Sequence, residues 1–221
     1  MAQNISANLK VTPLIEIHKE LGAKLVPFAG WNMPIQFAGV LNEHNCVREK
    51  VGLFDVSHMG EVEVEGSGAK DFLQYLLTND LGKMFDGSIL YSLMCYENGG
   101  VVDDLLVHRF SENHYFLCVN ASNSDKDYQW IVKNSTSFDV NVKNISSETS
   151  QLALQGPNAE NVLQPLCDFS LNDLSYYNFK KGRVNDVESI ISRTGYTGED
   201  GFELYLTPEK VLEVYRSLIS E

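Results

Sequence analysis

Two adjacent carboxylic acids, Asp103 and Asp104, stand inside the otherwise apolar segment NGGVVDDLLV. Apolar strands are depleted in Asp, and burying a charge in one is costly unless the charge is paired or hydrogen-bonded. A carboxylate kept in such a place could stabilise a developing positive charge or act as a general base. The simpler alternative is that both carboxylates lie on an edge strand or a turn and are exposed to water.

The hairpin that carries the two aspartates decides which of them can face a pocket. Successive side chains of a strand point to opposite faces, so at most one of the pair faces a given site. The Asn-Gly pair at 98–99, between two apolar runs, predicts the hairpin turn. A two-residue loop places Tyr91 on the face of Asp104, whereas a three-residue loop with a bulge places Tyr91 on the face of Asp103. The sequence leaves both registers open.

A second candidate is the glycine-rich segment RTGYTGEDGFE, which runs from Arg193 to Glu203. Its three glycines permit tight turns and a close approach of a ligand to the backbone. The segment matches neither a dinucleotide-binding fingerprint nor a P-loop, and a strand-like ELYL ends it where a phosphate-binding motif would begin a helix. A plain hairpin turn is the alternative interpretation.

The histidines and cysteines lack the spacing of a metal or redox site. His44 and His58 belong to no HExxH motif, and a structural role is the simpler interpretation for both. The four cysteines are far apart in the sequence and form no CxxC motif. Ser57 and His58 are adjacent and lack the GxSxG turn of a hydrolase. We therefore expect neither a metal nor a covalent enzyme intermediate.

The pattern of apolar residues predicts the elements that must hold these groups. Helices are expected over residues 11–21, 43–51, 69–76, 122–133 and 158–166, and from 207 onward. Strands are expected within 23–40, and over 59–65, 89–97, 101–110, 114–120, 139–146, 151–157, 188–192 and 203–206. Thr12 is expected to cap the first helix, with Pro13 at its first position.

Two of these elements carry more specific expectations. The segment GEVEVE alternates, with valines on one face and Glu61, Glu63 and Glu65 on the other, which predicts a half-exposed strand. The last helix has an apolar stripe. In a mixed sheet, an amphipathic helix usually packs against the sheet and leads into another strand. Because this sequence has no further strand after this helix, we expect part of the apolar stripe to be uncovered.

Composition and charge narrow the class of protein. The chain has 221 residues, of which 43% are hydrophobic, and a formal net charge of -13. This composition can build a core, and the acidic balance argues against nucleic-acid binding. No apolar run reaches 18 residues, so we expect no membrane span. The N-terminal MAQNISANLK has neither an apolar signal core nor an Arg-rich amphipathic pattern, which favours a cytoplasmic bacterial enzyme.

Five segments, taken in order, resemble a known family. They are FAGWNMP, EHNCVREKVGLFDVSHMGEVEVEG, ENGGVVDDLLVHRF, ALQGPNA and RTGYTGEDGFELY. Together they are similar to the aminomethyltransferases of the glycine cleavage system, the T-protein family, from about residue 12 to the end of the chain. Each motif alone is modest, but five in order at family-like spacing are specific.

The resemblance implies an α+β fold with two antiparallel-sheet subdomains flanked by helices, the second inserted into the first. Residues 1–60 and 147–221 are then expected to form the discontinuous subdomain with the GYTGEDGFE loop. Residues 61–146 are expected to form the inserted subdomain with the GGVVDD hairpin. Family members continue into an arginine-containing folate motif and a C-terminal barrel domain that this sequence lacks, so the resemblance implies that this chain alone is poorly active.

The resemblance also implies a reaction. The aminomethyl group on the lipoyl arm of the H-protein is transferred to tetrahydrofolate, which gives 5,10-methylenetetrahydrofolate, ammonia and the dihydrolipoyl arm, without a metal. Asp103, the first aspartate of the pair, matches the catalytic position. The residues implied in folate binding are Glu203, Tyr91, Asn120, Met59, Tyr196 and Glu199.

Three alternatives to this reaction stay open. A folate-dependent iron–sulfur assembly factor would carry a cysteine in a KGCYxGQE-like motif, where this chain has RTGYTGEDGFE. A demethylase fused to a flavin oxidase would show a flavin-binding GxGxxG ahead of this region, and none precedes it here. A module that binds folate or docks the H-protein without turnover would need the same residues, so only an assay separates it.

Overall fold

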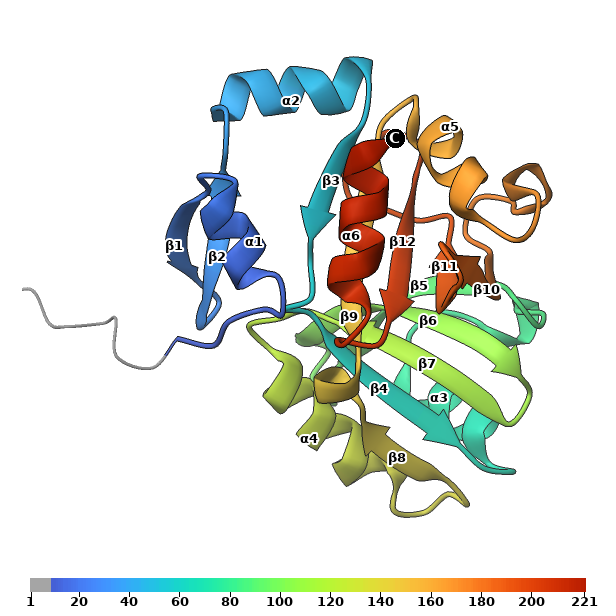
Figure 1. Ribbon diagram of the computed structural model, residues 1–221. Helices are drawn as coiled ribbons and strands as arrows, with labels where there is room; N and C mark the ends of the chain where they lie inside the picture. Colours follow the sequence, from blue (N-terminus) through green and yellow to red (C-terminus); the bar gives the residue numbers. More distant parts are fainter. Residues whose placement is uncertain (1–8) are drawn as a thin grey trace, which may run out of the picture. The chain divides into compact units, whose positions relative to one another are not determined.

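The computed structural model describes residues 9–221, which divide into two compact units (Figure 1). Unit 1 comprises the chain up to His58 together with residues 150–171 and 181–221. Unit 2 comprises residues 59–149 and 172–180. The sequence-based scheme placed 172–180 in the first subdomain, whereas their contacts group them with unit 2. The first eight residues of the predicted first subdomain lie outside the described residues.

Among the described residues, unit 1 contains a five-stranded sheet in the order β10-β11-β12-β9-β3. Its strands are β3 (Gly52–Asp55), β9 (Ser150–Gln155), β10 (Phe179–Val184), β11 (Val187–Ser192) and β12 (Gly201–Leu206). Strand β12 pairs antiparallel with both β9 and β11, which places Glu203 opposite Ala153 on one side and Ser192 on the other. Neither β3 nor β10 was expected from the sequence.

The remaining elements of unit 1 are short. They are α1 (Ile15–Glu20), β1 (Lys24–Phe28), β2 (Trp31–Gln36), α2 (Val40–Glu49), α5 (Ala159–Leu163), α6 (Val211–Ser220) and the 3₁₀ turn η4 (Gln164–Leu166). A further 3₁₀ turn, η5 (Leu171–Asp173), continues into the residues that group with unit 2. Helix α6 packs against β9. Val211, Val214, Tyr215 and Leu218 of its apolar stripe are buried, whereas Ile219 is 53% exposed, so the stripe is uncovered only near its C-terminal end.

The predicted cap of the first helix was also wrong. Helix α1 begins at Ile15, and the hydroxyl of Thr12 donates to Oδ2 of Asp55 at 2.6 Å. Asp55 is buried and also lies 2.8 Å from Nε2 of His18. A buried carboxylate needs several donors, so Thr12 serves the core in place of the helix end.

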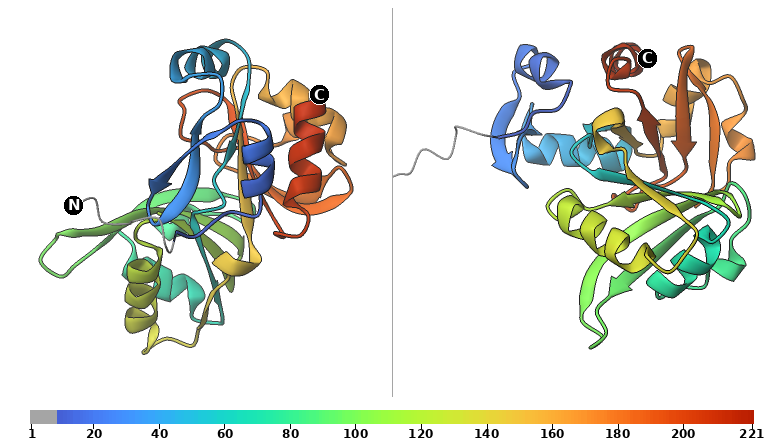
Figure 2. Two further views of the ribbon diagram at one scale, coloured as in Figure 1. Left: turned by 60° about the vertical axis from the view of Figure 1, so that its left-hand side comes forward. Right: turned by 90° about the horizontal axis from the view of Figure 1, so that it is seen from below.

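Among the described residues, unit 2 contains a five-stranded sheet in the order β5-β6-β7-β4-β8, with antiparallel pairing throughout. The strands are β4 (Gly60–Glu65), β5 (Ile89–Cys95), β6 (Val101–Ser111), β7 (His114–Val119) and β8 (Asn141–Asn144). The helices are α3 (Ala69–Leu76) and α4 (Ser124–Ser135), with 3₁₀ turns η2 (Leu81–Lys83) and η3 (Ser146–Glu148). Figure 2 shows α3 and α4 side by side in its left view.

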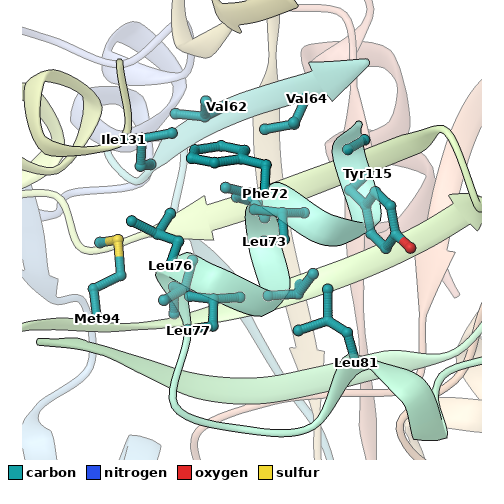
Figure 3. Close-up of a cluster of buried hydrophobic side chains, with 14 of the residues drawn as sticks. Val62, Val64, Phe72, Leu73, Leu76, Leu77, Leu81, Met94, Tyr115 and Ile131 are labelled. Carbon is teal, nitrogen blue, oxygen red and sulfur yellow. The ribbon is translucent and has the colours of Figure 1, made fainter. Parts of the chain in front are cut away.

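The core of unit 2 lies between this sheet and its two helices. Phe72 and Leu73 of α3 and Ile131 of α4 meet Val62 and Val64 of β4 (Figure 3). Each of these side chains is at most 1% exposed. The spacing of apolar residues in α3 and the alternation in β4 therefore produce one continuous apolar layer.

The outer face of β4 differs from the predicted one. Glu61 was expected on an exposed face, but it is only 1% exposed. Burial raises the pKa of Glu61 well above its ordinary value, which favours the neutral form of this side chain. The α+β class with two antiparallel sheets, by contrast, is confirmed.

Candidate functional site

The β5–β6 hairpin fixes the directions of the two aspartates. The N–H of Tyr96 donates to the carbonyl of Gly100, so three residues form the loop. Cys95 then pairs with Val101, but Met94 pairs with Asp103, so β6 has one extra residue at 102. This bulge shifts the register by one residue and turns every later side chain of β6 to the opposite face.

Asp103 therefore points to the core side of the sheet. Asp103 as a whole residue is 8% exposed, and its carboxylate is surrounded by N–H donors. Nδ2 of Asn120 donates to Oδ1 at 3.0 Å, and Nδ2 of Asn123 donates to Oδ2 at 3.0 Å. The backbone N–H of Asp104 also donates to Oδ1 at 3.0 Å. Burial opposes ionisation, but hydrogen bonds from Asp127, Asn123, Asn120 and Asp104 lower the pKa of Asp103, so it is an anion.

Asp104 points to the other face, where Tyr91 also lies. The hydroxyl of Tyr91 donates to Oδ2 of Asp104 at 3.0 Å. Nδ2 of Asn120 approaches Oδ1 of Asp104 at 3.1 Å, so one amide group contacts both carboxylates. Asp104 is half-buried and Tyr91 is 46% exposed. Of the two aspartates, Asp104 is the one that a bound molecule next to Tyr91 can reach.

Unit 1 holds the second group of candidate residues, around Glu203 on β12. The hydroxyl of Thr194 donates to Oε2 of Glu203 at 2.5 Å, and Nε2 of Gln151 donates to Oε1 at 2.8 Å. Burial raises the pKa of Glu203, and these two hydrogen bonds counteract only part of that rise. Each carboxylate oxygen can accept a second hydrogen bond, so Glu203 keeps room for a ligand's donors.

Two of the three glycines in the glycine-rich loop lie against a neighbouring side chain, and the third, Gly198, has a positive φ of 77°. A Cβ atom at Gly195 or at Gly201 would collide with the side chain of Gln155. Nε2 of Gln155 donates to the carbonyl of Thr194 at 3.0 Å, and its Oε1 accepts from the hydroxyl of Thr197 at 2.9 Å. Gln155 thus fixes the loop at Thr194 and Thr197, and the hydroxyl of Thr194 is in position to donate to Glu203.

The other predicted residues lie at the edges of these two groups. Tyr196 is fully exposed in the glycine-rich loop. Glu199 forms an ion pair with Arg48 at 2.6 Å, and Arg48 also donates to the carbonyl of Thr197. Met59 is half-buried in the turn before β4 and belongs to unit 2. The structure thus joins Tyr91, Asn120 and the aspartates in unit 2, while Glu203, Glu199 and Tyr196 lie in unit 1.

Two residues next to Asp103 were not anticipated, namely Asn123 and Asp127. Both follow Asn120 in the segment NASNSDKD, where α4 begins. Asn123 directly precedes α4, and its carbonyl accepts from the N–H of Asp127 one helical turn later at 2.8 Å. In the turn before the helix, the N–H of Asn123 donates to the carbonyl of Asn120 at 3.0 Å. A run of amides and carboxylates spaced three and four residues apart, next to a predicted strand with two aspartates, was the available signal.

Within residues 9–221, His44, His58 and the cavity of unit 1 lie apart from these two groups of residues. His44 is exposed, and His58 packs edge-on against Phe28. Glu63, Glu65 and His114 are close enough to share a cation, and Nε2 of His114 lies 2.8 Å from Oε1 of Glu63. A cavity of about 450 Å³ in unit 1 is lined by residues such as Phe28, Ile35 and Phe54, and by none of the predicted site residues.

Comparison with known proteins identifies the family. The family model for the GCVT N-terminal domain matches residues 14–221. The chain therefore belongs to this family, and the resemblance to glycine cleavage T-proteins is confirmed.

Individual relatives agree with this assignment. Similar proteins include the aminomethyltransferases of Alkaliphilus metalliredigens, 51% identical over 213 residues, and Desulfitobacterium hafniense, 54% identical over 211 residues. Both alignments cover 96% of this chain, which spans 58% of the length of these relatives. The crystal structure of the glycine cleavage aminomethyltransferase T from Bartonella henselae matches with a TM-score of 0.90 at 37% identity, over 96% of this chain and 58% of that one.

A more distant structure shows only the shared fold. A heterotetrameric sarcosine oxidase from a Corynebacterium species aligns with a TM-score of 0.60 at 14% identity, over 81% of this chain. In addition, no helix within residues 9–221 has both the length and the apolar character needed to cross a membrane.

Proposed function

We propose that this protein takes part in tetrahydrofolate-dependent aminomethyl transfer in glycine cleavage. Its donor is then the aminomethyl-lipoyl arm of the H-protein, and its products are 5,10-methylenetetrahydrofolate, ammonia and the dihydrolipoyl arm. A cytoplasmic location in a bacterium is part of the proposal. The membership of the family supports it, and the observation that carries it is a half-buried carboxylate, Asp104, held by Tyr91 and Asn120.

The chemistry requires a fixed negative charge beside the reacting carbon. A carbon bonded to both sulfur and nitrogen becomes cationic as either group departs: it is iminium-like when the thiolate leaves and thionium-like when ammonia leaves. A carboxylate that is already oriented stabilises this charge without reorganising, and a preorganised group of this kind contributes about 3 kcal/mol. It can also orient or deprotonate the attacking nitrogen, which is typically worth about 10² to 10⁴ in rate.

The geometry favours Asp104 for this role over Asp103, which was the sequence-based assignment. The carboxylate oxygens of Asp103 already accept three hydrogen bonds, and this side chain lies on the core side of the sheet. Asp104 instead shares its face of the sheet with the exposed Tyr91. In this proposal Tyr91 and Asn120 orient Asp104, and Asp103 supports it from behind through Asn120. Met59, Tyr91 and Asn120 also provide apolar, aromatic and amide contacts of the kind that small-ligand pockets use.

Glu203 fits the role of an anchor for the folate ring. The ring presents N–H donors, and each oxygen of Glu203 already accepts one hydrogen bond and can accept another. Thr194 and Gln151 fix the direction of the carboxyl group. Tyr196 and Glu199 shape the loop around it, with Glu199 held by Arg48.

One assay tests the proposal directly. The intact protein that carries this sequence is mixed with aminomethyl-loaded H-protein and tetrahydrofolate, and ammonia and 5,10-methylenetetrahydrofolate are measured. The proposal predicts that both products form in equal amounts. When tetrahydrofolate is omitted, neither product should form at a comparable rate. Binding of tetrahydrofolate or H-protein without either product would instead assign a binding module without turnover.

A further inference from the structure

A second acid, Asp127, lies behind the aspartate pair at the start of α4. It is 0% exposed, and neither of its carboxyl oxygens accepts a hydrogen bond from any N–H or O–H group of residues 9–221. Nζ of Lys126 is 3.5 Å from Oδ1, but it donates to the carbonyl of Val102 at 2.5 Å. An ionised carboxylate in this position would lack the donors that buried charges require.

Asn123 links Asp127 to Asp103, because its carbonyl accepts from the backbone N–H of Asp127 at 2.8 Å and its Nδ2 donates to Oδ2 of Asp103 at 3.0 Å. A hydrogen bond between the two carboxyl groups lowers the pKa of Asp103 and raises that of Asp127. Two ionised carboxylates have only acceptor atoms, so one of the two must carry a proton. Asp103 accepts from three N–H groups, belonging to Asn120, Asn123 and Asp104. Asp127 accepts from none, so the proton belongs to Asp127.

We propose that Asp127 remains protonated and donates its hydrogen bond to Asp103, and that this pair positions Asp104 through Asn120. Asp103 then carries the single negative charge of the pair and aligns the amide of Asn120. That amide in turn contacts the carboxylate of Asp104 at 3.1 Å. Asp127 is a positioning residue, because it acts through Asp103 and Asn120. Its effect on transfer rests on the proposed function, whereas the shared proton does not.

The electrostatic surroundings agree with this arrangement. Burial, then the hydrogen bond and the charge of Asp103, raise the pKa of Asp127 to about 8, and the opposing influence of Lys126 is smaller. The other elements that pack against α4 are α3, β4 and β8, and the first two present core side chains such as Phe72 and Val62. Asp103 and Lys126 are thus the charged groups that act on Asp127 among the described residues.

The first test observes the proton without any substrate. Carbon NMR of the aspartate carboxyl groups, followed as a function of pH, should show one group that titrates near pH 8. This signal should disappear in Asp127→Asn and persist in Asp125→Asn, which removes an exposed acid from the same helical turn. In Asp103→Asn the same group should titrate at lower pH, because the neighbouring charge is gone. If every aspartate of the wild type titrates in the ordinary range of about 3.5, the proposal is overturned.

The second test measures the consequence for transfer. If Asp127 supports Asp104, the wild-type kcat should fall several-fold as pH rises through about 8, while KM for tetrahydrofolate changes less. Asp127→Asn keeps an N–H donor toward Asp103 but cannot ionise, so its kcat at pH 7 should stay within about threefold of wild type and its alkaline fall should vanish. Asp127→Ala, which keeps no donor, should lose about tenfold at all pH values. An alkaline fall that is unchanged in Asp127→Asn contradicts the positioning role.

The two tests separate the inference from the proposed function. A titration near pH 8 that depends on Asp127, in a protein that forms no product at any pH, supports the shared proton and rejects aminomethyl transfer. Product formation without such a titration supports aminomethyl transfer and rejects the inference. If Asp127→Asn does not fold, the titrations of the wild type and of Asp103→Asn still test the inference. The wild-type signal that titrates near pH 8 should then titrate at lower pH in Asp103→Asn.

Discussion

The hydroxyl of Tyr91 and Oδ2 of Asp104 are joined by a hydrogen bond of 3.0 Å across the β5–β6 hairpin. This contact exists because one extra residue in β6 shifts the register between Met94 and Cys95. The shift separates two chemically identical neighbours, so that Asp103 enters a network of buried donors and Asp104 faces the exposed tyrosine. The roles of the two aspartates therefore follow from the bulge.

The bridging amide of Asn120 is the first target for substitution. Asn120→Ala removes the group that contacts both Asp103 and Asp104, and a hydrogen bond to a charged group is worth about 1.5–3 kcal/mol. We expect kcat for transfer to fall by about 10- to 100-fold. The control Asn134→Ala removes an amide that contacts only the carbonyl of Trp130 within α4. Equal rates in the two variants would show that Asn120 does not orient the site.

Glu203 should determine how strongly tetrahydrofolate stabilises the protein. At about 100 times its dissociation constant, a ligand of the native state adds about 2.7 kcal/mol to the free energy of unfolding. Glu203→Ala should reduce this increment, because it removes the acceptor for the ring's donors. Each variant is compared with its own ligand-free melting curve, and Glu188→Ala, an exposed position on β11, serves as the control. If tetrahydrofolate stabilises Glu203→Ala as much as it stabilises the wild type, another residue must anchor the folate ring.

The contact between Gln155 and the glycine-rich loop should appear as non-additivity. Gly195→Ala introduces a methyl group where the side chain of Gln155 lies, and overpacking of this kind typically costs about 1–3 kcal/mol. Gln155→Ala removes the obstacle together with its hydrogen bonds. The double variant should therefore lose less stability than the sum of the single variants, as measured by urea unfolding. Strict additivity would mean that the two residues do not compete for space.

The protonated Asp127 should also affect stability as a function of pH. Its pKa is about 8 in the folded protein, compared with an ordinary value of 3.8 for an aspartic acid, so the folded state retains a proton that the unfolded chain has released. The contribution of Asp127 to stability thus falls as pH rises from about 4 to about 8 and is constant above that window. Asp127→Asn lacks this titration, so its free energy of unfolding relative to wild type should increase across the same window. A pH-independent difference would contradict the raised pKa.

The sequence was sufficient for the elements whose pattern is local. The apolar spacing in α3 predicted a helix and the alternating valines of β4 predicted a strand, because burial selects the side chains that alternate or repeat with the backbone. The prediction that Glu61 is exposed was wrong, because alternation tells which face a residue is on but not what covers that face. The prediction that Thr12 caps the first helix was wrong because its hydrogen-bonding partner, Asp55, is distant in the sequence.

The candidate site was predictable in its composition but not in its geometry. The family motifs drew attention to Tyr91, Asn120 and Glu203, and the structure gives each of them a specific hydrogen-bonding partner. The register of the hairpin depended on the bulge at 102, which two alternative loop lengths could not reveal. Asp127 was missed because a carboxyl group on a helix usually indicates a solvent-exposed face.

The most direct test of the central claim compares Asp104→Asn with Asp103→Asn in the aminomethyl-transfer assay of the intact protein. The Asn side chain has nearly the same shape but no charge, so the comparison isolates electrostatic stabilisation. We predict that Asp104→Asn lowers kcat by about 10² to 10³ while tetrahydrofolate binding is retained, and that Asp103→Asn causes a smaller loss of kcat together with a loss of stability. If Asp104→Asn retains nearly full kcat and Asp103→Asn abolishes transfer in a stable protein, Asp104 is not the carboxylate that meets the reacting carbon.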